Sequence, residues 1–153
     1  MKNRLLSLFA VLMVASVTVI AGETQLASDV NLDGVKCIVA PRDAQASKSA
    51  EYKEGKVYFC CGGCAGKFAA SEKKYATQAN RQLVQTKQYV QTGCPLSGGD
   101  VDPATEVTVD GTKVAFCCGK CKAAVEGAED KEKSSMVFSD KAFAKAYKKA
   151  DKS

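Results

Sequence analysis

The feature that most constrains this chain is a set of four cysteines that occurs twice with the same spacing. In each copy, one cysteine is followed after 22 residues by a Cys-Cys-Gly-x-Cys motif, and the copies are offset by 57 residues without an insertion. The quartets are Cys37, Cys60, Cys61 and Cys64, then Cys94, Cys117, Cys118 and Cys121. These are all 8 cysteines of the chain, so we treat it as two related units.

The first residues have the pattern of a secretory signal peptide. Lys2 and Arg4 precede an almost wholly apolar segment at residues 5–20, and Ala21 offers a small residue for cleavage directly after it. The apolar segment is at the short end of the ~20 residues that a transmembrane helix needs, which leaves a retained anchor as the alternative. We predict that residues 1–21 are removed, and that residues 22–153 form a secreted or periplasmic protein without a stable membrane anchor.

The charge of the chain does not indicate a nucleic-acid partner. The formal net charge of +5 falls to +3 when Lys2 and Arg4 are removed, because no acidic residue leaves with them. Basic and acidic residues are interspersed, and no basic stripe with interleaved aromatic residues occurs in the sequence. We therefore predict metal ions as partners and no nucleic acid, while the sequence identifies no protein partner.

Each copy is predicted to contain a β-hairpin that leads into the cysteine motif. In the second copy, residues 106–109 and 113–116 flank Asp110-Gly111, which is a strong signal for a two-residue hairpin turn. In the first copy, residues 50–52 and 56–59 flank Glu54-Gly55. The hairpins bring the paired cysteines of each quartet to the end of a strand.

Helices are predicted after each motif, which makes the fold class α+β. The predicted helices cover residues 65–80, 122–128 and 141–149, the last one capped by Ser139 or Asp140. Further strands are predicted at residues 82–91 and 135–138, and irregular structure at residues 23–31, 43–49 and 151–153. The predicted units are residues 22–81 and residues 82–153, the second of which includes the C-terminal strand and helix.

The chain has no histidine, so the metal ligands that the repeat can supply are cysteine sulfurs. Thiols from a hairpin end and from a distant loop can together enclose a metal ion in a protein with a small core. Thiolate sites favour Zn2+ and Cu+ over Mg2+ or Ca2+. All eight cysteines are therefore candidate ligands, for about two ions per chain. Cys61 and Cys118 are possible fourth ligands, since adjacent cysteines do not easily face one ion.

Two further expectations concern the groups around the sulfurs. Cys64 and Cys121 lie where helices are expected to begin, so their thiols are predicted to ionise most easily. Asp43 and Asp100 recur at the repeat offset and could each add an oxygen ligand. Aspartate is an ordinary turn residue after such a loop, and we favour that role for both.

The spacing resembles the TRASH/YHS group of heavy-metal-binding domains. The similarity rests on Cys37, Phe59-Cys60 and Cys64-x3-Phe68 in the first copy, and on Cys94-Pro95-Leu96-Ser97-Gly98, Phe116-Cys117 and Cys121 in the second. It covers residues 35–80 and 93–128, with Val125 in place of the aromatic residue and one additional cysteine per copy. The resemblance implies two treble-clef-like units and a role in metal trafficking, resistance or sensing.

Three functions are compatible with these patterns. We favour metal binding without catalysis, in which the metal is either cargo or structural, because no catalytic residues are recognisable. A disulfide-stapled scaffold is the first alternative, since cysteine-rich exported proteins commonly form disulfides. A thiol–disulfide oxidoreductase is the second, because Cys61-Gly62-Gly63-Cys64 and Cys118-Gly119-Lys120-Cys121 are C-x-x-C pairs at predicted helix starts.

Overall fold

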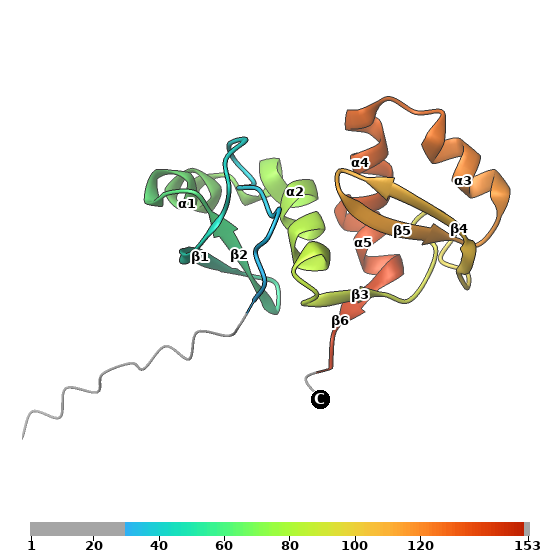
Figure 1. Cartoon of the computed structure of the whole chain (residues 1–153), viewed down its shortest axis with the longest axis horizontal. Helices are drawn as coiled ribbons and strands as arrows, with labels where there is room; N and C mark the ends of the chain where they lie inside the picture. Colours follow the sequence, from blue (N-terminus) through green and yellow to red (C-terminus); the bar gives the residue numbers. More distant parts are fainter. Residues whose placement is uncertain (1–29, 152–153) are drawn as a thin grey trace, which may run out of the picture.

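The computed structural model describes residues 30–151, and the predicted signal peptide lies outside this part of the chain. The described chain is a mixed α+β protein with three antiparallel sheets of two strands each. Two units lie side by side, each with a hairpin and helices, and a short sheet joins them (Figure 1). Within the described residues, every helix is too short or too polar to cross a membrane.

The first unit consists of a loop, a hairpin and two helices. The hairpin pairs β1 (Gln45–Tyr52) with β2 (Gly55–Phe59). The helices are α1 (Gly62–Ala70) and α2 (Glu72–Gln85), separated at Ser71, where the backbone is not helical. The prediction of one helix over residues 65–80 therefore misplaced both ends and missed the break.

The strand predicted at residues 82–91 was mostly wrong. α2 continues to Gln85, across the predicted boundary between the units, and only β3 (Tyr89–Gln91) is extended. The reason is the burial of Ala76, Ala79 and Leu83, whose spacing of three and four residues places them on one face of a helix. That face packs into the core, and this burial determines the helical conformation.

The second unit begins with the predicted hairpin, formed by β4 (Asp102–Val109) and β5 (Thr112–Phe116). Its turn at Asp110 and Gly111 has φ values of 46° and 75°, the conformation that favours an Asp-Gly pair. The helices that follow are α3 (Gly119–Glu126), α4 (Asp130–Phe138) and α5 (Asp140–Ala146). The chain then forms β6 (Tyr147–Lys149).

Two predictions for the second unit were wrong. Residues 135–138, predicted as a strand, are the last turn of α4, because a short apolar run does not distinguish a buried helix from a strand. The final helix ends at Ala146 instead of residue 149, because Tyr147 pairs with Gln91 and Lys149 pairs with Tyr89 in the β3–β6 sheet. Ser139 is the N-cap residue, as predicted, but its side chain forms no capping hydrogen bond.

The two hairpins share an irregularity that the sequence did not reveal. In the first, the pairing shifts between Gln45 and Ser49, and in the second between Asp102 and Val107. Gln45 pairs with Phe59 and Asp102 pairs with Phe116, which are the same positions of the repeat. β1 therefore begins inside the segment 43–49 that was predicted to be irregular, and both bulges lie beside the cysteine motifs.

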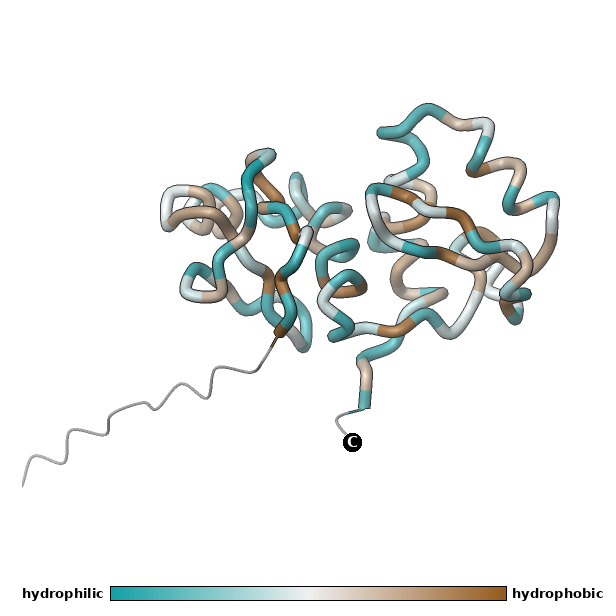
Figure 2. The backbone as a smooth tube through the Cα atoms, viewed as in Figure 1, coloured by the Kyte–Doolittle hydropathy of each residue, from teal (hydrophilic) through white to brown (hydrophobic). Residues whose placement is uncertain are grey.

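The two units pack together around a shared core. α2 contacts α4 and α5, and residues of both units belong to one buried hydrophobic cluster. The rings of Tyr89 and Phe143 lie 4.9 Å apart, and those of Phe143 and Tyr147 stack at 5.2 Å. Figure 2 shows hydrophobic stretches along the strands and in α2, between the units. The core and the β3–β6 sheet hold the units in one arrangement.

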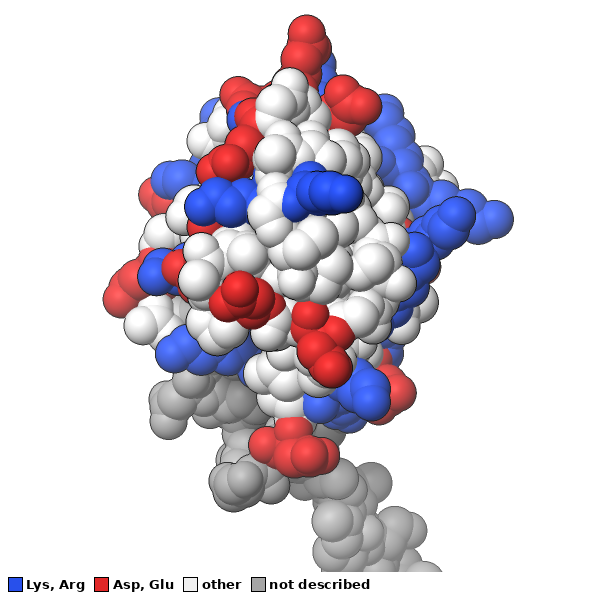
Figure 3. All heavy atoms as spheres, turned by 90° about the vertical axis from the view of Figure 1, so that its right-hand side faces the viewer, with Lys and Arg blue, Asp and Glu red and all other residues white. Residues whose placement is uncertain are grey.

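One face of the second unit shows how the surface charge is distributed. Figure 3 shows basic and acidic side chains scattered over this face, with broad uncharged areas between them. Ion pairs join opposite charges across both hairpins, Lys56 with Glu51 in the first and Lys113 with Glu106 in the second. Several basic side chains lie together along the right-hand edge of this view.

Asn80 on α2 connects the units through buried hydrogen bonds. Its side chain is 0% exposed, accepts a hydrogen bond from the Tyr52 hydroxyl at 3.2 Å, and donates to the Phe138 carbonyl at 2.9 Å and to Asp140 at 2.9 Å. A change of Asn80 to alanine should lower the free energy of unfolding by about 2 kcal/mol or more, because buried polar groups lose their partners.

Urea unfolding of the Asn80→Ala variant measures this effect, with Gln78→Ala as the control. Gln78 is exposed on the same helix, so the control carries the change in helix propensity without the loss of buried hydrogen bonds. Equal stability of the two variants would show that the Asn80 contacts do not hold the units together.

Candidate metal centres

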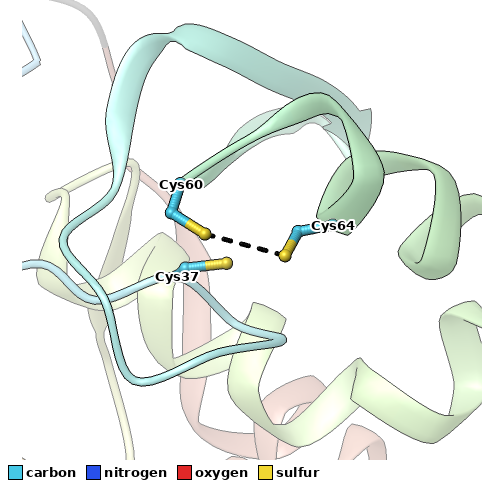
Figure 4. Close-up of side chains that lie close together, drawn as sticks. All are labelled: Cys37, Cys60 and Cys64. Carbon is cyan, nitrogen blue, oxygen red and sulfur yellow. Dashed lines mark hydrogen bonds between the residues drawn. The ribbon is translucent and has the colours of Figure 1, made fainter.

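Three segments of the first unit bring sulfur atoms to one point. Cys37 lies in the loop before β1, Cys60 follows the end of β2, and Cys64 is in the first turn of α1. Figure 4 shows their three sulfurs turned toward one another. The Cys37 loop closes through a hydrogen bond from the Cys37 amide to the Arg42 carbonyl at 2.8 Å. A loop, a hairpin end and a helix start thus form one sulfur cluster.

The second unit repeats this construction. Cys94 lies in the loop before β4, Cys117 follows β5, and Cys121 is in the first turn of α3. Its loop closes through a hydrogen bond from the Cys94 amide to the Gly99 carbonyl at 2.8 Å, which matches the Cys37–Arg42 bond at the repeat offset. The structure therefore brings together three sulfurs of each predicted quartet.

The sulfur separations fit a shared metal ion. The sulfurs of Cys37, Cys60 and Cys64 all lie within 4.8 Å of one another, as do those of Cys94, Cys117 and Cys121. Cys60 and Cys64 are 3.6 Å apart, and Cys117 and Cys121 are 3.7 Å apart. Two sulfurs bound to one tetrahedral zinc ion at ~2.3 Å lie about 3.8 Å from each other. We call these clusters the first and second triads; each could hold a metal ion.

The remaining cysteine of each quartet lies outside its triad but next to it. Cys61 and Cys118 are exposed N-cap residues of α1 and α3. The Cys61 sulfur is 4.0 Å from that of Cys60, and the Cys118 sulfur is 3.8 Å from that of Cys117. All eight cysteines are free thiols. Each triad therefore has one additional thiol on its solvent side.

In each triad, the environment of the loop cysteine favours the thiolate. Burial raises the pKa of Cys37, but the backbone amides of Cys60, Val39 and Ala40 outweigh it and lower the pKa overall. Burial also raises the pKa of Cys94, but the hydroxyl and amide of Ser97 and further backbone amides outweigh this effect. The pKa of Cys94 is lowered to about 6. The loop positions thus favour the thiolate form of one cysteine in each triad.

The prediction that Cys64 and Cys121 ionise most easily was wrong. Loss of hydration raises the pKa of both thiols to about 12, and the neighbouring thiols add to the shift. The helix start instead favours the N-cap position, where the backbone amides of Cys64 and Cys121 lower the pKa of Cys61 and Cys118. A bound cation would lower the pKa of the triad thiols, because it stabilises the thiolate form.

The two aspartates of the repeat do not join the triads. Neither Asp43 nor Asp100 belongs to a group of potential metal ligands within residues 30–151. Asp43 forms an ion pair with Lys36, its partner in the bridge that closes the first loop. The preference for a turn role over an oxygen ligand agrees with this arrangement for Asp43.

Two glutamines fix the cysteine loops against the hairpins, and sequence reasoning missed both. Gln82 accepts a hydrogen bond from the Tyr58 amide at 2.6 Å and donates to the carbonyls of Tyr58 and Lys36, each at 3.0 Å. Tyr58 lies two residues before Cys60, and Lys36 directly before Cys37. One side chain therefore sets the distance between the loop and the hairpin end of the first triad.

Gln91 makes the same three bonds in the second unit. It accepts from the Ala115 amide at 2.9 Å and donates to the carbonyls of Ala115 at 2.6 Å and Gly93 at 2.9 Å. Ala115 and Gly93 correspond to Tyr58 and Lys36 at the repeat offset. Gln82 itself aligns with Ser139, so the two glutamines come from different positions of the repeat, which is why the alignment of the copies did not reveal them.

Substitution of either glutamine should weaken one triad and spare the other. Gln82→Met removes the bonds at similar volume and should lower the metal affinity of the first triad by about 10–100-fold, the usual effect of losing groups that orient ligands. Gln91→Met should act on the second triad alone. Competition with a chromogenic chelator measures both affinities, and the untouched triad serves as a reference within the same molecule.

Exposed Gln78→Met on α2 is the control for a methionine at a surface position. If Gln82→Met weakened both triads equally, or neither, the glutamine would have no specific role in placing the first triad.

The residue behind each triad also follows the repeat. Phe68 is 1% exposed and packs its ring 5.5 Å from that of Phe59, next to the first triad. Val125 occupies the equivalent position in the second unit and is fully buried. The aromatic residue is therefore replaced by a smaller apolar residue that keeps the same place in the core.

Comparison of the chain with protein-family models, with curated proteins and with solved structures finds no match.

Proposed function

We propose that this protein binds thiophilic metal ions, Zn2+ or Cu+, through two thiolate triads, with one ion in each unit and no catalysed reaction. The observation that carries the proposal is the convergence of three sulfurs at two equivalent points of the repeat, with all members of each triad within 4.8 Å of one another. Sulfur ligands without histidine or carboxylate favour soft ions over Mg2+ and Ca2+. The absence of histidine from the whole sequence strengthens this preference.

The same geometry supports metal binding over the two alternatives. All eight cysteines are free thiols, which supports ligand roles over a disulfide scaffold. A thioredoxin-like C-x-x-C motif belongs to a βαβ unit, whereas the sheets of residues 30–151 are antiparallel pairs. The loop cysteine, 24 residues before Cys61, has no part in a C-x-x-C exchange but completes a metal triad.

The order of elements in each unit supports a treble-clef-like description. A cysteine loop precedes a hairpin, the hairpin ends in a cysteine, and the following helix supplies another from its first turn. This order agrees with the resemblance to the TRASH/YHS group, from which we propose a role in metal trafficking, resistance or sensing. Export to the periplasm or the cell exterior is part of the same proposal and rests on the pattern of residues 1–21.

Metal analysis of protein purified under reducing conditions tests the proposal. We expect about two ions per chain. The triad thiols should not react with a thiol reagent until the metal is removed. A metal-free protein with eight reactive thiols, or a mass deficit of eight hydrogens from four disulfides, would contradict it. Insulin reduction, measured in parallel, should show no turnover.

A further inference from the structure

The sulfurs of each quartet form a graded series from the surface to the interior. In the first unit, Cys61 is exposed, Cys60 is half-buried, and Cys37 and Cys64 are buried. In the second, Cys118 is exposed, Cys117 and Cys121 are half-buried, and Cys94 is 0% exposed. The exposed cysteine therefore occupies the same place relative to the triad in both units.

The middle sulfur of each series is close to both its outer and its inner neighbour. Cys60 lies 4.0 Å from Cys61 and 3.6 Å from Cys64, and Cys117 lies 3.8 Å from Cys118 and 3.7 Å from Cys121. All four separations are close to the ~3.8 Å between two sulfurs that share a tetrahedral zinc ion. The middle sulfur can thus remain bound to an ion while the other ligands change.

We propose that Cys61 and Cys118 are capture ligands, which take a metal ion from solvent together with Cys60 or Cys117 and pass it inward to the triad. This inference rests on the proposed function, because it assigns the path by which ions reach and leave the same two sites. The triads hold the ion at equilibrium, and the exposed thiols determine how fast it arrives and departs.

The transfer is a ligand exchange without a change of oxidation state. Cys61 and Cys60 bind the ion first, and each thiol releases its proton to water. Cys64 and Cys37 then bind with release of their protons, while the bond from the ion to Cys61 breaks and this thiolate takes up a proton from water. The second unit exchanges Cys118 for Cys121 and Cys94 in the same way, and departure of the ion reverses these steps.

Zinc exchange kinetics test the assignment. The full chain is loaded with Zn2+ and mixed with an excess of a chromogenic chelator, and zinc transfer is followed over time. Cys61→Ser should slow the release from the first triad by at least about tenfold, which corresponds to a loss of roughly 1.4 kcal/mol of barrier stabilisation. The second triad should release at the wild-type rate. Cys118→Ser should give the converse result.

Two further variants separate capture from damage to the fold. Serine is a preferred N-cap residue, so Cys61→Ser keeps the start of α1, and Ala69→Ser, exposed on the same helix, is the matched control. Cys61→His supplies another zinc ligand and should restore much of the release rate. Restoration by histidine is a result that a purely structural role of Cys61 would not produce.

The remaining outcomes decide against the inference in distinguishable ways. Unchanged release rates in both serine variants, with zinc bound, would overturn the capture role and leave the proposed function intact. Loss of one zinc ion from Cys61→Ser at equilibrium would show a permanent fourth ligand and would also overturn it. Failure of the wild-type chain to bind zinc or copper would overturn the proposed function itself.

Discussion

Substitution of Cys94 by serine should reduce the number of tightly bound ions from about two per chain to about one. Cys94 is fully buried within the second triad, and a serine hydroxyl there is a far weaker ligand for a soft ion than a thiolate. The first triad has its own loop, hairpin and helix, so its ion should remain. Metal analysis after gel filtration, or native mass spectrometry, measures the change directly.

Cys37→Ser is the matched variant and should remove the ion of the first triad in the same way. The double variant should bind no ion tightly. If Cys94→Ser kept both ions, or lost both, the two triads would not be separate sites.

Removal of the metal should lower the melting temperature by about 20 °C or more. An ion at 1,000 times its dissociation constant stabilises the folded state by about 4 kcal/mol, and two ions contribute about twice that. For a domain of this size, the melting temperature changes by about 3 °C per kcal/mol of stability. The shared core that contains Phe59, Leu83 and Phe116 should keep the metal-free chain partly folded. Differential scanning calorimetry with and without a strong chelator tests the shift.

The Cys37→Ser, Cys94→Ser double variant is the control for the chelator, because it lacks both proposed sites. Its melting temperature should not respond to the chelator. An equally small response in the wild-type chain would mean that the metal does not stabilise the fold.

The sulfur positions were the part of the structure that the sequence predicted best. Spacing alone indicated that a distant loop cysteine meets the hairpin end, and the structure places Cys37 beside Cys60 and Cys94 beside Cys117. The Asp110-Gly111 turn could also be predicted from local sequence, because its positive φ values suit these two residue types. Short-range chemistry and an exact repeat explain these successes.

The errors arose where burial by the other unit decides the structure. Leu83 and Val84 are compatible with a strand or a helix, and the packing of α2 against α4 and α5 makes them helical. Tyr147 was placed in a helix, but β6 forms because β3, which lies far earlier in the chain, offers a partner. Such long-range pairing leaves no local pattern, and a single sequence therefore could not predict it.

The pKa shifts of the thiols and the glutamine hydrogen bonds beside the triads could not be predicted from the sequence, for a different reason. The helix-start argument was sound in principle but was applied to Cys64 instead of the N-cap residue Cys61, because the helix begins at Gly62. Gln82 and Gln91 perform equivalent roles from unequal repeat positions. Only the folded backbone shows that both reach the loop and the hairpin of their triad.

X-ray absorption at the metal edge tests the central claim most directly. For protein loaded with Zn2+ under reducing conditions, we predict a first shell dominated by sulfur at ~2.3 Å, with about three sulfurs per ion. The chain has no histidine to contribute a nitrogen ligand. A shell composed mainly of oxygen, or a chain that retains no ion while its thiols stay reduced, would contradict the convergence of each triad on one metal ion.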